Sequence, residues 1–198
     1  MSADLFPTFL KLAGRRVVVV GGGPVAASKI ASLLAAQAAI TVVAPDVVDE
    51  IVQSGVEVVR RRFLPADLDE AWFVVAAAPP AVNRDVAAAG EARHLFVNAV
   101  DDPAHASAYL GGVVRKHGVT LAISTDGRAP ALAGLLREGL EATLPEDLRE
   151  WMAAADAARQ EWRNTGLPMT ARRPQLLAAI NALYSPRDAA AVVTESAR

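Results

Sequence analysis

The sequence predicts an α/β protein in which a parallel sheet is covered by helices on both faces. Apolar, strand-like runs alternate with helix-like segments along the first part of the chain, which is the order of parallel βαβ units. Residues 17–20 are four consecutive valines, and an apolar run without alternation is typical of a strand buried on both faces. Three glycines follow this run directly, which indicates a tight turn into the next helix.

The other expected elements follow from the same periodicities. In the first part we expect strands at residues 17–20, 39–45, 56–60, 72–78 and 95–100, helices at 25–34, 46–53 and 81–92, and a helical turn at 65–70. After residue 112 we expect one strand at 119–124 and helices at 130–144, 145–164 and 174–184. The sequence therefore predicts a second, mostly helical region after the sheet domain.

The glycine-rich turn matches a dinucleotide-binding fingerprint, with Gly21, Gly23 and Ala26 at its three small-residue positions. Gly21 would make the tight turn, Gly23 would let the backbone approach a pyrophosphate, and Ala26 would let the helix pack on the strand. Pro24 suits the first helical turn, where free N–H groups and the helix dipole favour phosphate. We therefore predict a Rossmann-type domain that binds a dinucleotide; a glycine turn that binds no ligand is the alternative.

Composition and charge exclude several classes of protein. The 198-residue chain has a net charge of −2, which argues against a general nucleic-acid binder. No apolar run approaches the roughly 18 residues of a membrane span, and the N-terminus lacks the layout of a signal peptide. The chain has no cysteine, so disulfides and thiolate chemistry are excluded. We therefore expect a cytoplasmic protein that acts on neither nucleic acid nor membrane.

Several segments resemble the siroheme-synthase family of precorrin-2 dehydrogenases, some of which are also sirohydrochlorin ferrochelatases. The matching segments are residues 6–10, 20–26 with Lys29, 42–45, 96–103, 121–133 and 135–141. The most specific are Val97-Asn98-x-Val100-Asp101-Asp102-Pro103 and Ile123-Ser124-Thr125-x-Gly127-x-x-Pro130-Ala131-Leu132-Ala133. The resemblance covers most of the chain through about residue 150.

The resemblance implies NAD-dependent dehydrogenation of precorrin-2 to sirohydrochlorin in siroheme biosynthesis, and it leaves metal insertion into sirohydrochlorin open. It also implies a homodimer whose tetrapyrrole site lies in a cleft between its parts. We expect an NAD-binding Rossmann domain at 1–113, a dimerisation region at 114–144 and a small helical domain at 145–198. The alternative is a non-catalytic regulator on the same fold that senses NAD or binds another ligand.

Two departures from the family pattern affect the expected substrate cleft. The family usually has a Phe-x-x-Pro-Ala-like stretch where this chain has Tyr109-Leu110-Gly111-Gly112-Val113. Asp126 stands where the family usually has glycine. We expect these departures to change the shape of the cleft more than the fold.

Asp101 is the expected catalytic residue. It follows the fifth strand directly, and ligands of open parallel sheets bind outside the carboxyl ends of the strands. It also matches the family's proposed catalytic aspartate, and a carboxylate there could act as a general base. The alternative is an aspartate that caps the turn before Pro103.

The expected cofactor is NAD, because no arginine directly follows the second strand to bind a 2′-phosphate. Asp46 would reach a ribose hydroxyl or cap the next helix, and Asn98 would touch the nicotinamide ribose or satisfy strand-end backbone. Residues 60–62, all arginine, would line the adenine end or form a solvated face. The expected cofactor-binding residues are Gly21, Gly22, Gly23, Pro24, Val25, Ala44, Pro45, Asp46 and Asn98.

Precorrin-2 carries many carboxylates, so its cleft should contain hydroxyl and basic groups. The expected substrate-binding residues are Ser124, Thr125, Arg128 and Arg137. The alternative for Ser124 and Thr125 is capping of the following helix, and the alternative for the arginines is surface charge. The three histidines do not have metal-site spacing, so no metal ligand is predicted; His105 would be a surface-loop residue or would help to bind ferrous iron.

Overall fold

The computed structural model describes residues 5–184, which form two compact units. Within these residues, the first unit comprises 5–112 and Ser124–Ala133, and the second comprises Val113–Ile123 and 134–184. The loop at Ser124–Ala133 thus returns to the first unit after a hairpin that belongs to the second. The predicted domain boundaries after residues 113 and 144 stay a prediction. The first segment of the first unit ends at Gly112, next to the predicted boundary at residue 113.

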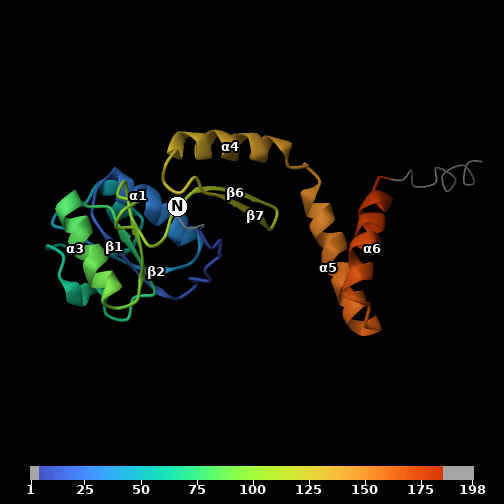
Figure 1. Cartoon of the computed structure of the whole chain (residues 1–198), viewed down its shortest axis with the longest axis horizontal. Helices are drawn as coiled ribbons and strands as arrows, with labels where there is room; N and C mark the ends of the chain where they lie inside the picture. The colour runs from blue at the N-terminus through green and yellow to red at the C-terminus, as the bar shows by residue number, and fades with distance from the viewer. Residues whose placement is uncertain (1–4, 185–198) are drawn as a thin grey trace, which may run out of the picture. The chain divides into compact units, whose positions relative to one another are not determined.

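The first unit is built on a five-stranded parallel sheet (Figure 1). Its strands are β1 (Arg16–Val20), β2 (Ala39–Val43), β3 (Glu57–Val59), β4 (Phe73–Ala76) and β5 (Phe96–Ala99). Their order across the sheet is β3-β2-β1-β4-β5, with the four-valine strand in the centre. This order matches the first five strands of the classic dinucleotide-binding fold, in which the strand order reverses beside the first strand. The predicted α/β fold class is confirmed.

Helices cover both faces of this sheet. They are α1 (Pro24–Ala35), α2 (Asp49–Gln53) and α3 (Pro80–Glu91), with a short 3₁₀ helix η1 (Pro65–Leu68). Val17 and Val19 pack with Ile30 of α1 in one core, whereas Val18 and Val20 belong to the core of the opposite face. Successive strand side chains point to opposite faces, so a run of valines serves both cores at once.

A loop after β5 closes the edge of the sheet. The backbone amides of Ser107 and Ala108 both donate to the carbonyl of Val97, at 2.9 and 3.1 Å. In return the Val97 amide donates to the Ser107 hydroxyl, at 2.8 Å. These bonds satisfy β5 backbone groups that an exposed edge strand would leave unpaired.

The second unit contains a hairpin and helices. The hairpin strands are β6 (Gly112–Lys116) and β7 (Val119–Ile123), followed by α4 (Pro130–Thr143), α5 (Leu148–Thr165) and α6 (Met169–Ala182). His117 and Gly118 both have positive φ, at 47° and 88°, as a two-residue hairpin turn requires. Strand β6 was not predicted, because the glycines at its start had indicated a break.

Helix α6 begins at Met169, five residues before the predicted start at Pro174. Pro174 lies inside the helix, where it removes one backbone hydrogen bond. The first turn of α6 is bound to the residues before it, since the Arg172 side chain donates to the carbonyl of Leu167 at 3.1 Å. Within residues 5–184, no helix is both long enough and apolar enough to cross a membrane.

Candidate dinucleotide site

The loops that follow the parallel strands of the first unit meet at the carboxyl edge of the sheet. The Gly21 amide donates to the carbonyl of Val43 at the end of β2, at 3.1 Å. The Val48 amide donates to the carbonyl of Gly22, at 2.8 Å, so the loops after β1 and β2 are bound to each other. The structure therefore gathers the glycine loop and the loops after β2, β4 and β5 at the edge where such folds bind ligands.

The first two glycines are required by the fold itself. Gly21 has φ +126°, and a Cβ atom there would lie 2.1 Å from the carbonyl oxygen of Ala77. A Cβ atom on Gly22 would lie 1.9 Å from the carbonyl oxygen of Asp46. Both distances are far below van der Waals contact, so the close approach of three loops at this edge depends on the missing side chains.

The third glycine has no such structural requirement. Gly23 is the N-cap of α1 with φ −86°, and a Cβ atom there would meet nothing within 4 Å. The backbone amides of Gly22, Gly23, Val25 and Ala26 find no protein acceptor within the described residues, and Pro24 has no amide hydrogen. Free donors at a helix N-terminus beside an open position fit the pyrophosphate of a dinucleotide.

Asp46 lies exposed beyond the end of β2, where a ribose hydroxyl is expected. The alternative role as a helix cap is excluded, because α2 begins at Asp49 and its N-cap is Val48. The Asp46 carboxylate makes no hydrogen bond to the rest of residues 5–184. Ala44 is buried and Pro45 is exposed, so these two residues carry the chain from the sheet to the surface.

One of the three arginines after β3 is structural. The Arg61 guanidinium donates to the Asp67 carboxylate at 2.8 Å, and the Leu64 amide donates to the same carboxylate at 2.8 Å. The Arg61 hydrogen bond, against the effect of burial, holds the pKa of Asp67 below its ordinary value. Arg61 is therefore committed to the fold by its ion pair, although it is exposed like its neighbours Arg60 and Arg62.

Asn98 is buried near the carboxyl end of β5, with 7% of its surface exposed. Its Nδ2 donates to the carbonyl of Ala108 at 3.0 Å, so one half of the amide satisfies backbone. Its Oδ1 is buried and has no hydrogen-bond partner among residues 5–184. A buried acceptor without a donor is costly, and a ligand hydroxyl or a bound water would supply that donor.

Asp101 occupies an unusual backbone conformation two residues after the end of β5, because the strand ends at Ala99 and not at residue 100 as predicted. Its φ of +56° lies in the left-handed region, which aspartate tolerates better than most residues, and its side chain is exposed. The contacts of the following turn are made by Asp102, whose carbonyl accepts from the His105 amide at 3.2 Å. Capping of this turn therefore falls to Asp102, and the Asp101 carboxylate is bound to no other described residue.

The loop at residues 124–129 lies against the loop after β5, within the same unit. A Cβ atom on Gly127 would lie 3.2 Å from Pro103 Cγ and 3.2 Å from Tyr109 Cε1. The Tyr109 hydroxyl donates to the carbonyl of Pro103 at 3.1 Å. Tyr109, which belongs to the stretch that departs from the family pattern, is thus part of the contact between the two loops.

Both hydroxyls of this loop accept hydrogen bonds from the backbone. Ser124 Oγ accepts from the Asp126 amide at 3.1 Å, and Thr125 Oγ1 accepts from the Ala129 amide at 3.2 Å, directly before α4. Ser124 thus closes a local turn and Thr125 binds the residue just before α4, so neither hydroxyl accepts from an amide of the helix itself. Each hydroxyl still retains its own proton for donation, so these bonds do not prevent it from binding a carboxylate.

The two predicted substrate arginines differ in their surroundings. Arg128 is 82% exposed and its guanidinium lies 3.7 Å from the Asp126 carboxylate, an ion pair of low strength at the surface. Arg137 belongs to the second unit and is bound to Glu138 and Glu141 of its own helix, at 3.2 and 2.8 Å. The first unit therefore brings together every predicted site residue except Arg137.

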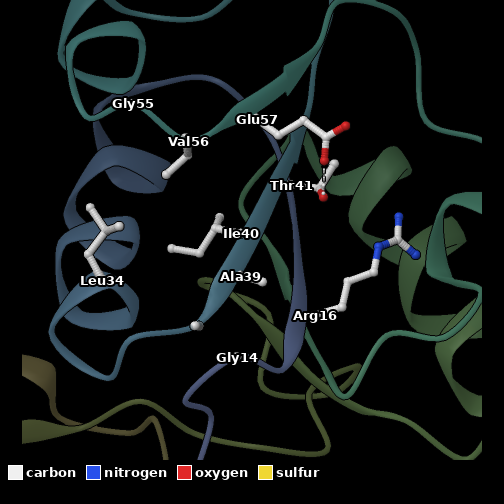
Figure 2. A pocket seen from close by; sticks show the side chains of 10 residues that line it. Gly14, Arg16, Leu34, Ala39, Ile40, Thr41, Gly55, Val56 and Glu57 are labelled. Carbon is white, nitrogen blue, oxygen red and sulfur yellow. Dashed lines mark hydrogen bonds between the residues drawn. The ribbon is translucent and has the colours of Figure 1, made fainter.

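A surface depression of about 450 Å³ lies at the amino ends of the strands, away from the carboxyl edge that holds the candidate site (Figure 2). It is lined by residues at the amino ends of β1, β2 and β3, among them Arg16, Thr41 and Glu57. Thr41 Oγ1 donates to the Glu57 carboxylate at 2.8 Å, which satisfies both groups within the fold. Among residues 5–184, no group of three or more His, Asp and Glu side chains has metal-site geometry.

The strand order and the open glycine position at the carboxyl edge define a dinucleotide-binding protein. A family described as "Putative NAD(P)-binding" matches residues 8–112, which cover the whole sheet. The chain belongs to this family, and its first unit is an NAD(P)-binding domain.

Curated relatives extend the similarity beyond the sheet. The chain is 39% identical over 164 residues to a siroheme synthase of Tolumonas auensis; the matched residues make up 81% of this chain and 34% of the relative. It is 38% identical over 175 residues to a siroheme synthase of Photorhabdus laumondii; the matched residues make up 86% of this chain and 37% of that relative. The chain thus spans about a third of the length of these relatives, and the resemblance to siroheme synthases is confirmed.

A solved structure matches almost the whole chain. The structure titled "SirC, precorrin-2 dehydrogenase" superposes with a TM-score of 0.71 at 29% sequence identity. The match covers 91% of this chain and 92% of that chain. The likeness therefore includes both units.

Proposed function

We propose that the protein catalyses the NAD-dependent oxidation of precorrin-2 to sirohydrochlorin. The observation that carries this proposal is the similarity to the precorrin-2 dehydrogenase SirC over 91% of this chain and 92% of that one. A likeness confined to the sheet would indicate only cofactor binding, because many enzymes share that fold. A likeness that also includes the second unit supports the same substrate class.

The proposed cofactor site uses the carboxyl edge of the first unit. The amides of Gly22, Gly23, Val25 and Ala26 bind the pyrophosphate. Asp46 binds the adenosine ribose, and Asn98 Oδ1 accepts a hydrogen bond from a hydroxyl of the bound cofactor. Gly21, Ala44 and Pro45 form the backbone of the loops that position these groups at the carboxyl edge of the sheet. When bound, NAD supplies the acceptor for the hydride that leaves the substrate.

The proposed substrate groups lie on the two loops that contact each other beside this edge. The hydroxyl protons of Ser124 and Thr125 and the guanidinium of Arg128 bind carboxylates of the tetrapyrrole. Arg137, which belongs to the second unit, stays a predicted substrate-binding residue. Asp101 acts at the reacting part of the ring, either as a general base or as a negative charge beside the cationic nicotinamide.

The proposal includes a cytoplasmic homodimer in which residues 114–144 form the dimerisation region and residues 145–198 a helical domain. Four leucines of α4 support an association surface, since Leu132, Leu135, Leu136 and Leu140 are 40–66% exposed. Exposed leucines repeated along one helix are typical of a surface that another chain covers. Light scattering should give twice the mass of the chain at micromolar concentration; a monomer mass would contradict the dimer.

Anaerobic absorbance spectroscopy tests the proposed reaction. Precorrin-2 mixed with the protein and NAD should convert to sirohydrochlorin with one equivalent of NADH, and the conversion should stop when NAD is left out. A second addition of ferrous or cobaltous ion shows whether metal insertion follows. An unchanged spectrum with NAD present would overturn the proposed function.

A further inference from the structure

The residues after Asp101 form a rigid turn. The His105 amide donates to the carbonyl of Asp102 at 3.2 Å, which closes a four-residue turn with Pro103 at its second position. Proline at this position fixes the backbone torsion that the turn needs. The turn is also held from outside, because Tyr109 donates to the Pro103 carbonyl and Gly127 lies against the proline ring.

The same turn brings two functional side chains together. His105 Nδ1 lies 2.9 Å from each oxygen of the Asp102 carboxylate. A carboxylate can only accept, so Nδ1 carries a proton and, in the neutral ring, Nε2 keeps a free electron pair. Nε2 has no hydrogen-bond partner among residues 5–184, and 43% of the His105 side chain is exposed. The pair therefore has the arrangement of an oriented base.

The position of this pair is that of a group acting on the ligand. It stands on the loop that leaves the carboxyl edge after β5, next to the loop that carries Ser124, Thr125 and Arg128. The charged groups on these two loops are Asp101, Asp126 and Arg128 besides the pair itself. The Asp101 carboxylate, in contrast, is oriented by no side chain of residues 5–184.

We infer that His105, oriented by Asp102, accepts the proton that the substrate loses during oxidation. This inference rests on the proposed function. The substrate gives up a hydride, which reduces NAD to NADH, and an N–H or C–H proton, which forms a new bond to Nε2 of His105. The ring becomes an imidazolium stabilised by the Asp102 carboxylate, and it later releases the proton to water. Asp101 then serves as a fixed negative charge beside the oxidised nicotinamide.

A matched pair of histidine variants tests this inference on the full chain. His105→Asn should lower kcat by about 10²–10⁴-fold, the usual range for a lost general base, with NAD affinity and the KM for precorrin-2 unchanged. His94→Asn is the control, because His94 is also exposed but precedes β5 at the opposite edge of the sheet. The control should keep the wild-type kcat.

Chemical rescue separates a catalytic from a structural role. Added imidazole should restore part of the turnover of His105→Ala, because it supplies the missing base, and it should leave His94→Asn unchanged. A folding defect would not respond to imidazole. Failure of rescue together with a raised KM would assign His105 to substrate binding and overturn the inference.

Asp102 is a positioning residue in this scheme, and its test is a double-mutant comparison. Asp102→Asn should lower kcat without changing NAD affinity, since the amide favours the wrong tautomer of the histidine. Adding Asp102→Asn to His105→Ala should cause no further loss, because the carboxylate acts only through the ring. Additive losses would contradict this role.

The outcomes also separate this inference from the function on which it rests. If the wild-type protein does not oxidise precorrin-2, the proposed function and the role of His105 are both overturned. If the wild-type protein and His105→Asn oxidise it at rates within about twofold of each other, only the role of His105 is overturned.

Discussion

The two units of the chain differ in what holds them together. In the first unit, the central strands are buried on both faces, and Val17, Val18 and Val19 have no exposed surface. Each fully buried valine contributes roughly 1.5–3 kcal/mol relative to an exposed one. In the second unit, α5 has only Leu148 and Trp162 buried, and α6 has no buried residue within the described part of the chain.

In the second unit, hydrogen bonds and an ion pair between side chains connect elements that share few buried apolar residues. Trp162 Nε1 donates to Gln175 at 2.9 Å and joins α5 to α6. Trp151 Nε1 donates to the Tyr184 hydroxyl at 2.6 Å, and Lys116 binds Glu146 at 2.9 Å. The first unit is thus stabilised by its own core, whereas the second keeps much of its apolar surface for other contacts. The following predictions test this contrast.

The largest effect is expected at Gly22. Gly22→Ala places a methyl group 1.9 Å from the Asp46 carbonyl oxygen, so the loops after β1 and β2 must separate. We expect a loss of more than about 4 kcal/mol in the free energy of unfolding, which is exceptional for one substitution. Urea denaturation measures it. A variant as stable as the wild type would show that this edge is loosely packed.

Gly23 should behave in the opposite way. Gly23→Val adds a side chain whose Cβ atom meets nothing within 4 Å, so the fold should keep nearly the wild-type melting temperature. The same side chain fills the space proposed for the pyrophosphate, so NAD should no longer bind in a fluorescence titration. Normal NAD affinity in this variant would show that the loop is only a turn.

Asp101 is expected to affect turnover and not stability. Asp101→Asn tolerates the left-handed backbone and should lower kcat by roughly 10²-fold, the scale of one lost electrostatic contact, with NAD affinity retained. Asp101→Ala should be impaired to a similar extent. Rescue of Asp101→Ala by small carboxylates would instead make Asp101 the base and would contradict the role of His105.

Asp67 tests the stability of the first unit against pH. Asp67→Asn removes the charge that binds Arg61 and should cost about 1–3 kcal/mol near neutral pH. The pKa of Asp67 is lowered in the folded state, so this contribution is present above the unfolded-state pKa of about 3.9 and is lost as the pH falls through the folded value. Melting curves of the two proteins should therefore converge in acid. A constant difference at every pH would contradict the ion pair.

The smallest effect is expected for the corresponding pair of the second unit. The Lys116 ammonium lowers the pKa of Glu146, but the Glu146 side chain is 95% exposed, so water screens its charge. Glu146→Gln should leave the melting temperature unchanged at any pH. A loss as large as that of Asp67→Asn would remove the contrast between the two units.

The sequence by itself determined the elements whose signal is local. The four valines, the glycine fingerprint and the alternation of strand and helix led to the observed parallel sheet, because side-chain periodicity is contained within a short window. The same reasoning missed β6 and placed the start of α6 five residues late. In both cases a local signal, a glycine pair or a proline, was outweighed by contacts formed after folding.

Only the tertiary structure decided what each residue of the site can do. The fingerprint distinguishes Gly21 from Gly23 and assigns no role to Gly22, whereas the structure shows that Gly21 and Gly22 both face backbone from other loops and that Gly23 faces open space. The free oxygen of Asn98 depends on a loop ten residues away, and the support of the His105 turn depends on Gly127 and Tyr109. The Asp102–His105 spacing with an intervening proline was visible in the sequence. Its significance was not, because a side chain's available hydrogen bonds are set by neighbours that are distant along the chain.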